Sequence, residues 1–375
     1  MRILPVISNN IPQANTATSM VRDNAIDILK GIGILLVIIG HSGCPSMLRI
    51  LIYMIHMPLF FLASGYFLNV ERLADTHNYI KRKIKSLYIP FLKYALPFLF
   101  LHNLLIKIGV MTTEYGARYY NFTTTLTELM LRCIFMEVHD EALLGTYWFV
   151  QALFFSHILL AFTYSMLSKK RIRGRISFLA FLALALLISY AHYLYPNIKT
   201  VCLYRICMGV VFIWIGHILR KKTYKNRHIL LAFIVFVITF IIHPASMKEQ
   251  SDMYDCVSLL ISGSCGFILL LRLSQCINKI RGYFLSKIPL LLSCMGKQSF
   301  YIMTFHFLSF KAVSLLVILY YGWDDFSLIG MHPCIASVRE TYWWIVYSLA
   351  GIILSLAIHS TISFIEKNIR LRIRH

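Results

Sequence analysis

The sequence predicts an all-α polytopic membrane protein with about ten transmembrane helices and both termini in the cytoplasm. Its composition is the first observation: 58% of the 375 residues are hydrophobic and only 14% are charged, with a mean hydropathy of +0.68. Soluble domains carry about 25% charged residues. The second observation is that apolar residues form runs of about 20, the length a helix needs to cross a bilayer. These two observations exclude an ordinary soluble domain.

Apolar runs that end at charged residues or at proline and glycine define the predicted spans. The ten ranges are roughly 26–43, 49–68, 87–108, 144–167, 176–195, 200–219, 228–243, 256–273, 299–320 and 341–363. We expect a cytoplasmic tail over 1–25, a transmembrane domain over 26–365 and a basic cytoplasmic tail over 366–375. The first 20 residues are mixed polar, so no cleavable signal peptide is expected.

Lysine and arginine predict the orientation. Twenty-seven of them lie in one set of tails and inter-span segments and seven in the other. The richer set comprises the N-terminal tail, 69–86, 168–175, 220–227, 272–297 and the C-terminal tail. The positive-inside rule places this set in the cytoplasm. The net charge of +21 also suits nucleic acid, but short clusters between spans favour anchoring to anionic lipid, so no nucleic-acid partner is expected.

Nine scattered cysteines form no CxxC pair and show no alternating Cys/His spacing. This pattern predicts neither a zinc site nor a disulfide framework, and we expect no metal cofactor. Free thiols inside helices usually pack as small hydrophobes.

Ionisable residues within the first predicted span form the first candidate site, because a charge inside the bilayer is costly and usually functional. Asp27 and Lys30 are three residues apart, the spacing of an ion pair on a helix surface. Lys30 and His41 are separated by 11 residues, which places them about 16 Å apart along the axis and within about 20° of one face. One groove can therefore contact both side chains.

His56 enters the second predicted span from the outer side and can reach the depth of His41. Pro58 follows it, and proline within a helix removes a backbone donor and bends the chain. Freed backbone groups in a membrane need protein or a polar cavity around them. Two imidazoles and a kink at one depth therefore predict a cavity, although a structural role for His56 remains open.

Three further residues are candidates because of their depth. Arg205 lies early in the sixth span, where a charge needs a partner or a wet cavity, so it either contacts a substrate or forms an internal ion pair. His306 lies within the ninth span and is either a substrate contact or a packing histidine. Trp148 heads the fourth span, where it either belongs to an aromatic belt or stacks on a sugar. The long outer segment 109–143 is a candidate lid over a substrate site.

Several short motifs carry a resemblance to a known family. The first two spans contain Asp27-Ile28-Leu29-Lys30-Gly31-Ile32-Gly33, Gly40-His41-Ser42, His56-Met57-Pro58-Leu59-Phe60-Phe61 and Ser64-Gly65-Tyr66. Later motifs are Lys81 to Lys85 before Leu87-Tyr88-Ile89-Pro90, Tyr147-Trp148-Phe149, and Gly296-Lys297-Gln298-Ser299-Phe300-Tyr301 before Phe305-His306. Together they resemble the acyltransferase-three family of integral-membrane O-acyltransferases, which includes fucose 4-O-acetylase-like enzymes of bacterial surface polysaccharides.

The resemblance implies a ten-helix core, cytoplasmic acyl-CoA (acetyl-CoA above all) as donor, and a glycan or lipid-linked sugar acceptor across a bacterial inner membrane. Lys30, where the family often has arginine, is expected to hold donor phosphates, and Asp27 is expected to hold the Lys30 ammonium through their ion pair. Arg205 is expected to contact the donor thioester or the acceptor, unless it forms an internal ion pair. His41 is expected to act as general base or as acyl-carrying nucleophile, with His56 beside it. Trp148 and His306 are expected to contact the acceptor.

Two other functional classes suit parts of the pattern. A transporter or flippase also has many helices, broken spans and intramembrane charges, but the sequence shows no repeat of matched halves. A membrane glycosyl polymerase normally needs a larger outer loop or an acidic metal motif. An O-acyltransferase is therefore the prediction, and a transporter that performs no acyl transfer is the alternative.

Overall fold

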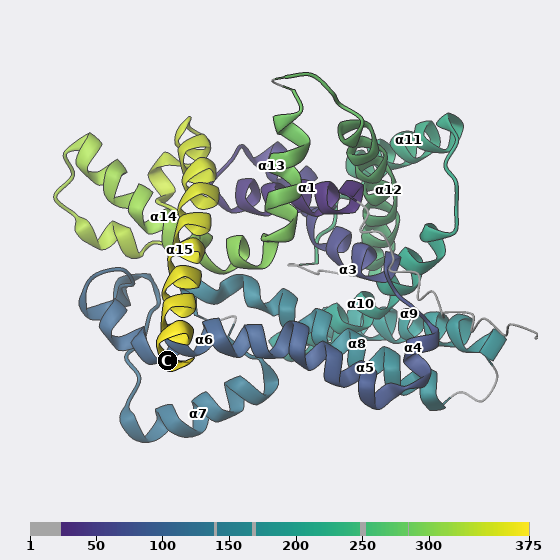
Figure 1. The fold of residues 1–375 in the computed structure, drawn as a ribbon, viewed down its shortest axis with the longest axis horizontal. Coiled ribbons are helices and arrows are strands. Elements are labelled where there is room, and N and C mark those ends of the chain that lie inside the picture. The colour runs from purple at the N-terminus through teal and green to yellow at the C-terminus, as the bar shows by residue number, and fades with distance from the viewer. Residues whose placement is uncertain (1–23, 139–140, 167–169, 248–252, 284, 375) are drawn as a thin grey trace, which may run out of the picture.

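The computed structural model describes residues 24–138, 141–166, 170–247, 253–283 and 285–374, and Figure 1 shows their arrangement. These residues form helices and no strands. The α-helices are α1 Asn24–His41, α2 Ser46–Tyr53, α3 His56–Tyr66, α4 Glu71–Ala74, α5 Thr76–Lys83, α6 Ile89–Lys107, α7 Phe122–Phe135, α8 Trp148–Met166, α9 Lys170–Leu194, α10 Ile198–Arg220, α11 Asn226–Ile242, α12 Met253–Asn278, α13 Lys287–Lys297, α14 Ser299–Tyr321 and α15 Trp343–Arg374. Short helical turns lie at Ile84–Tyr88, Thr113–Tyr115, Ala142–Tyr147, Phe326–Gly330 and Ala336–Val338.

Nine helical segments in the described chain are long and apolar enough to span a membrane, and α11 is a shorter apolar helix. The nine segments and α11 coincide in order with the ten predicted spans. The predicted all-α polytopic fold is therefore confirmed. The last helix, α15, continues to Arg374, so the described part of the predicted basic tail is helical.

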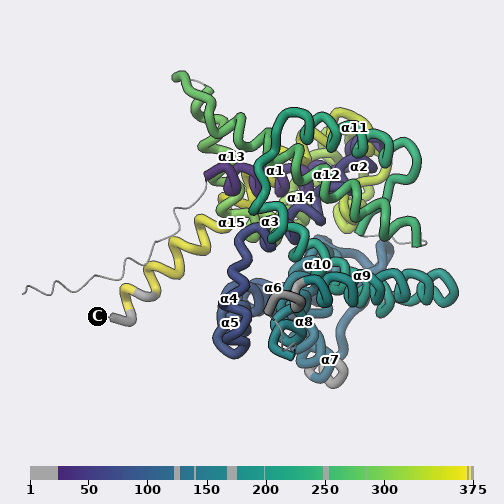
Figure 2. Tube along the Cα trace, turned by 90° about the vertical axis from the view of Figure 1, so that its right-hand side faces the viewer, coloured from purple at the N-terminus to yellow at the C-terminus, as the bar shows by residue number. Residues whose placement is uncertain are grey.

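The helices form two groups, which are visible in both Figure 1 and Figure 2. One group contains α1 to α3 and α11 to α15, and the other contains α4 to α10. Contacts between α3 and α10 join the groups. Helix α1 packs against α2, α3 and α12 to α15. Because α1 is apolar nearly all round, burial among several neighbours is the arrangement its sequence favours.

The second predicted span is broken into α2 and α3 at Met54 and Ile55. We expected Pro58 to bend this span. Instead, Pro58 lies in the first turn of α3, where a missing backbone donor costs little because those amides have no partner within the helix. The break lies before His56, and it separates the helix that carries Tyr53 from the helix that His56 begins.

The third predicted span begins earlier than its apolar run suggests. Helix α5, the turn Ile84–Tyr88 and helix α6 follow one another directly from residue 76 to 107. The basic run from Lys81 to Lys85, predicted as an inter-span segment, is therefore helical. Its side chains consequently point in different directions around a helix, and Lys83 faces the protein interior.

Glycines allow two helix pairs to approach backbone to backbone. A Cβ atom on Gly31 of α1 would collide with the carbonyl oxygen of Leu292 in α13, and one on Gly296 with that of Asp27. Gly65 of α3 likewise contacts Ile213 of α10. These close contacts hold α1 and α3, which carry the candidate residues, against the rest of the bundle.

We expect Gly296→Ala to lower the thermal stability of the purified protein, because the new methyl group overlaps a backbone atom that cannot move alone. Overpacking of this kind costs about 1–3 kcal/mol. Gly33→Ala is the matched control, since its Cβ meets the flexible end of Leu59 at 2.9 Å. A thermal melt measured in detergent tests the difference; equal melting temperatures for the two variants would show that the α1–α13 contact is looser than described.

Candidate active site

The first cavity, called the Lys30 cavity, has a volume of about 710 Å³ and lies between the two helix groups. Residues of α1, α3, α5, α8, α13 and α14 line it. Its described lining contains five basic side chains and one acidic side chain, that of Asp27. The basic residues are Lys30, Arg72, Arg82, Lys83 and Lys297. By the predicted orientation this cavity belongs to the cytoplasmic side, and its charge favours an anionic ligand.

The second cavity, called the Arg205 cavity, has a volume of about 790 Å³. Arg49, Arg205, Arg339, His332 and Asp255 contribute its charged and titratable lining, together with His41. Residues from the ends of α1 and α12, from α2 and from the segment after α14 surround it. By the predicted orientation this cavity belongs to the outer side of the membrane.

The two cavities share four lining residues: His41, Tyr53, Trp148 and Ser246. A ligand in either cavity can therefore reach the same small group of side chains. His41, the last residue of α1, is the only member of this group with an imidazole, the side chain best suited to proton transfer near neutral pH. The meeting of the two cavities at His41 is the central feature of the site.

Aromatic rings surround His41. The centre of its ring lies 5.2 Å from that of Phe307, 5.6 Å from that of His306 and 6.2 Å from that of Tyr53. The ring of Tyr53 also lies 5.0 Å from that of His56, so Tyr53 contacts both histidines. The sequence predicts that His41 and His56 lie at one depth, and both line the Lys30 cavity. The sequence does not single out Tyr53, because a tyrosine near the end of a span is usually part of the aromatic belt.

His56 is 5% exposed, and its Nδ1 donates a hydrogen bond to the Ile52 carbonyl at 2.8 Å. A carbonyl oxygen only accepts, so this bond assigns the proton to Nδ1 and leaves a lone pair on Nε2. The break between α2 and α3 makes the bond possible because it brings a carbonyl of α2 next to the first residue of α3. His56 is thus a fixed neutral imidazole that lines the Lys30 cavity.

Asp27 and Lys30 both line the Lys30 cavity, as does His41 at the other end of α1. This is the arrangement that their spacing predicts. Asp27 is 5% exposed, and the Lys30 ammonium lies 5.4 Å from the ring centre of Phe67. The roles of these residues in binding stay predictions.

A buried cluster on the same cavity has no signal in the sequence, because its members come from separate helices. The Lys83 ammonium donates to Nε2 of His157 at 3.0 Å, and the Ser64 hydroxyl lies 2.8 Å from the same nitrogen. The other nitrogen, Nδ1, therefore carries the proton and donates to the Tyr79 hydroxyl at 2.7 Å. His157 is fully buried, whereas Ser64, Tyr79 and Lys83 line the cavity. The neutral imidazole holds the Lys83 charge at the cavity wall.

Arg205 and Trp148 are adjacent, as the guanidinium lies 4.2 Å from the centre of the Trp148 ring. Arg205 is 6% exposed and donates from Nε to the Met247 carbonyl at 2.8 Å. It lines the Arg205 cavity, whereas Trp148 lines both cavities. Of the two contacts expected for Arg205, donor thioester or acceptor, its place on the Arg205 cavity favours the acceptor, and this role stays a prediction.

His306 is fully buried and is not among the residues that line either cavity. Its Nδ1 donates to the Met303 carbonyl at 2.7 Å. We expected His306 to contact the acceptor, but its position places it behind His41, so any influence on the reaction has to pass through another side chain.

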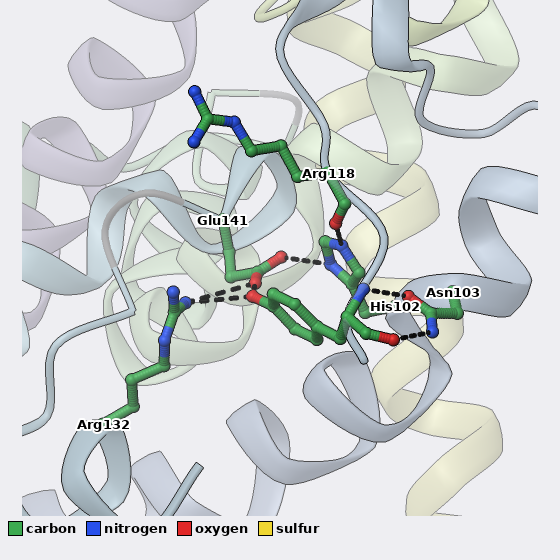
Figure 3. A network of polar contacts seen from close by, with 6 residues as sticks. His102, Asn103, Arg118, Arg132 and Glu141 are labelled. Carbon is green, nitrogen blue, oxygen red and sulfur yellow. Dashed lines mark hydrogen bonds and ion pairs between the residues drawn. The ribbon is translucent and has the colours of Figure 1, made fainter. Parts of the chain in front are cut away.

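A polar network, shown in Figure 3, connects described residues of the outer segment 109–143 to α6. His102 of α6 donates from Nε2 to the Arg118 carbonyl at 2.8 Å and from Nδ1 to the Glu141 carboxylate at 2.7 Å. Arg132 lies 3.4 Å from Glu141, and Asn103 makes two bonds of 2.8 Å with the backbone of Tyr120. None of the described residues of the segment lines either cavity. The network thus supports a fixed cover at one end of the bundle rather than a lid over the site.

Comparison with known proteins decides the family. A family model described as an acyltransferase domain matches residues 23–360, which is most of the chain. The chain belongs to this acyltransferase family. The predicted family is thereby confirmed, and the protein is a multi-pass membrane acyltransferase. Searches of curated proteins and of solved structures gave no match.

Within the described residues of this acyltransferase, no group of three or more His, Cys, Asp or Glu side chains is close enough to hold a metal ion. The expectation of a metal-free reaction stays a prediction. The basic and titratable lining of the two cavities consists mainly of imidazole, ammonium and guanidinium groups.

Proposed function

We propose that this acyltransferase transfers an acyl group, with acetyl expected, from cytoplasmic acyl-CoA to a sugar hydroxyl of a cell-surface polysaccharide across the bacterial inner membrane. The observation that carries the proposal is the meeting of two cavities of different lining at His41. A donor in one cavity and an acceptor in the other can present their reacting groups to a single imidazole without either substrate crossing the membrane.

The Lys30 cavity suits the donor. Coenzyme A carries several phosphate charges and a long, flexible arm that ends in the thioester. Five basic side chains around the Lys30 cavity match the phosphates, and charge-assisted hydrogen bonds to phosphate are among the stronger polar contacts. The rise of about 16 Å from Lys30 to His41 is similar to the length of that arm. Phosphates near Lys30 and Lys83 place the thioester near His41.

The Arg205 cavity suits the acceptor. Trp148 offers an aromatic face on which a sugar ring can stack. The Arg205 guanidinium packs against the Trp148 ring and fixes the orientation of the indole. Guanidinium and indole groups are common in polar recognition sites because each is rigid and donates hydrogen bonds. The acceptor hydroxyl then approaches His41 from the outer side.

In the general-base form of the reaction, the acceptor oxygen attacks the thioester carbonyl carbon while His41 removes the hydroxyl proton. The carbon–sulfur bond then breaks, and the proton passes to the departing thiolate, giving acylated sugar and free coenzyme A. In the nucleophile form, a ring nitrogen of His41 attacks the thioester carbonyl carbon, the carbon–sulfur bond breaks and the coenzyme A thiolate departs. The sugar oxygen then takes the acyl group from the imidazole, and its hydroxyl proton neutralises the thiolate. The surroundings of His41 are compatible with both forms, and the roles of His56 and Tyr53 are to orient it.

Mass spectrometry of surface glycans from cells with and without the gene tests the proposal. We expect the glycan to lose the mass of one acyl group when the gene is absent and to regain it with the wild-type gene. Unchanged glycan acylation, combined with loss of a transported compound, would favour the transporter alternative.

A further inference from the structure

His306 holds an unusual position behind His41. Its side chain is fully buried in α14, and its Nδ1 is fixed as a donor to the Met303 carbonyl at 2.7 Å. The proton therefore lies on Nδ1, and Nε2 carries a lone pair. That Nε2 atom is buried and has no hydrogen-bond partner in the described structure. Buried polar atoms nearly always have a partner, so an unpaired one calls for an explanation.

The nearest titratable ring in contact with His306 is that of His41. The ring centres are 5.6 Å apart and the planes are tilted by 40°. A direct N–H···N bond, with the nitrogens about 3 Å apart, brings two imidazole centres to roughly 5 Å. The two rings are thus within a small side-chain movement of a hydrogen bond. The two rings are tilted and not parallel, so their contact is not the stacked arrangement of simple packing and is compatible with this movement.

Aromatic side chains keep this contact dry. The ring of Phe307 lies 4.0 Å from that of His306 and 5.2 Å from that of His41, and Phe310 lies 5.6 Å from His306 on an edge-to-face contact. Water has little access there, because His306 is fully buried and lines neither cavity. In such surroundings a single hydrogen bond to a charged partner is worth more than in water.

We propose that His306 is a positioning residue that accepts a hydrogen bond from His41 when His41 becomes positively charged during acyl transfer. The inference rests on the proposed function, in which His41 gains a proton or an acyl group and becomes cationic in either form. In this cationic form, one ring nitrogen of His41 faces the substrates and holds the added proton or acyl group. The other ring nitrogen carries a hydrogen and can donate it in a hydrogen bond. The lone pair on Nε2 of His306, fixed by the Met303 carbonyl, receives that bond and holds the ring in its reactive orientation.

Three substitutions separate positioning from simple packing. His306→Gln keeps an acceptor oxygen near the place of Nε2, His306→Asn keeps a donor near the Met303 carbonyl but no acceptor near Nε2, and His306→Phe fills the space. The measurement is the transfer of radiolabelled acetyl groups from acetyl-CoA to glycan in membranes that carry the native acceptor. Both kcat and the KM for acetyl-CoA are determined for each variant, with the amount of folded protein measured by size-exclusion chromatography.

We expect His306→Asn and His306→Phe to lower kcat by about 10²-fold, the lower end of what a positioned acid–base group contributes, with an unchanged KM for acetyl-CoA. His306→Gln should keep most of the wild-type kcat. Equal kcat in wild type and in well-folded Asn and Phe variants would overturn the inference and make Nε2 a site for a structural water. Loss of folded protein in Asn and Phe, with the surviving molecules turning over normally, would also overturn it. Absence of transfer by the wild type would overturn the proposed function itself, so the two failures are distinguishable.

Discussion

His41→Ala is expected to abolish acyl transfer while leaving donor binding near normal. His41 is the imidazole at which the two cavities meet, whereas the basic side chains that match a phosphorylated donor lie toward the other end of α1 and on α5. Removal of a positioned general base typically costs about 10²–10⁴-fold in rate. The measurement is kcat for transfer of labelled acetyl groups, with binding of acetyl-CoA determined separately on the same preparation.

The matched control is His77→Ala, because His77 is exposed and lies on α5 outside both cavities. It should retain wild-type kcat. A folded His41→Ala protein that binds donor and acylates glycan at a near-normal rate would remove His41 from the mechanism and leave His56 as the next candidate. Incubation with labelled acetyl-CoA in the absence of acceptor separates the two forms of the reaction. Label bound to wild type and lost in His41→Ala indicates a nucleophile, and no bound label indicates a general base.

The second large effect is expected for substitution of Lys30 and Lys83, the lysines proposed to bind the donor. Lys30→Ala and Lys83→Ala should each raise the KM for acetyl-CoA by about 10- to 100-fold, because a hydrogen bond to a charged group contributes about 1.5–3 kcal/mol. Lys30→Arg should retain activity because it keeps the charge. The change in kcat should be small in comparison, since neither lysine shares the His41 end of the cavity.

Lys81→Ala provides the control for Lys83→Ala. The two lysines belong to one basic run, but Lys81 is exposed and lines neither cavity, whereas Lys83 bonds to His157 at 3.0 Å. If the whole run acts only as an electrostatic anchor for lipid, both variants should behave alike. If the KM for acetyl-CoA rises only in Lys83→Ala, the effect belongs to the Lys30 cavity. Equal KM values for both variants would contradict the proposal that this cavity binds the donor.

The sequence predicts the fold well because lipid imposes a simple pattern, in which each long apolar run becomes a helix. In the described chain, nine helical segments long enough to span a membrane and the shorter helix α11 follow the order of the ten predicted spans. The sequence also predicts that Lys30 and His41 share a cavity, because both lie on one helix and the helical repeat fixes their relative direction. Local periodicity is sufficient for such residues.

Contacts between distant segments were not predictable in the same way. His157 lies in the middle of an apolar span and Lys83 in a basic run typical of topology anchors, so only the packing of α5 against α8 reveals that they bond. The sequence predicts a bend of the second span at Pro58, whereas the span breaks earlier, at Met54 and Ile55. The sequence leaves open whether Arg205 contacts the donor or the acceptor, because depth along a span does not tell which cavity a side chain lines.

The central claim is that the donor and the acceptor reach His41 from opposite sides of the membrane. Sealed membrane vesicles from the native host test it, because acetyl-CoA does not cross a bilayer. In everted vesicles, whose cytoplasmic face is outward, added radiolabelled acetyl-CoA should acylate glycan enclosed in the lumen. Right-side-out vesicles should show no transfer until they are permeabilised. Equal transfer by intact right-side-out vesicles, or labelled glycan confined to the donor side of everted vesicles, would contradict the account.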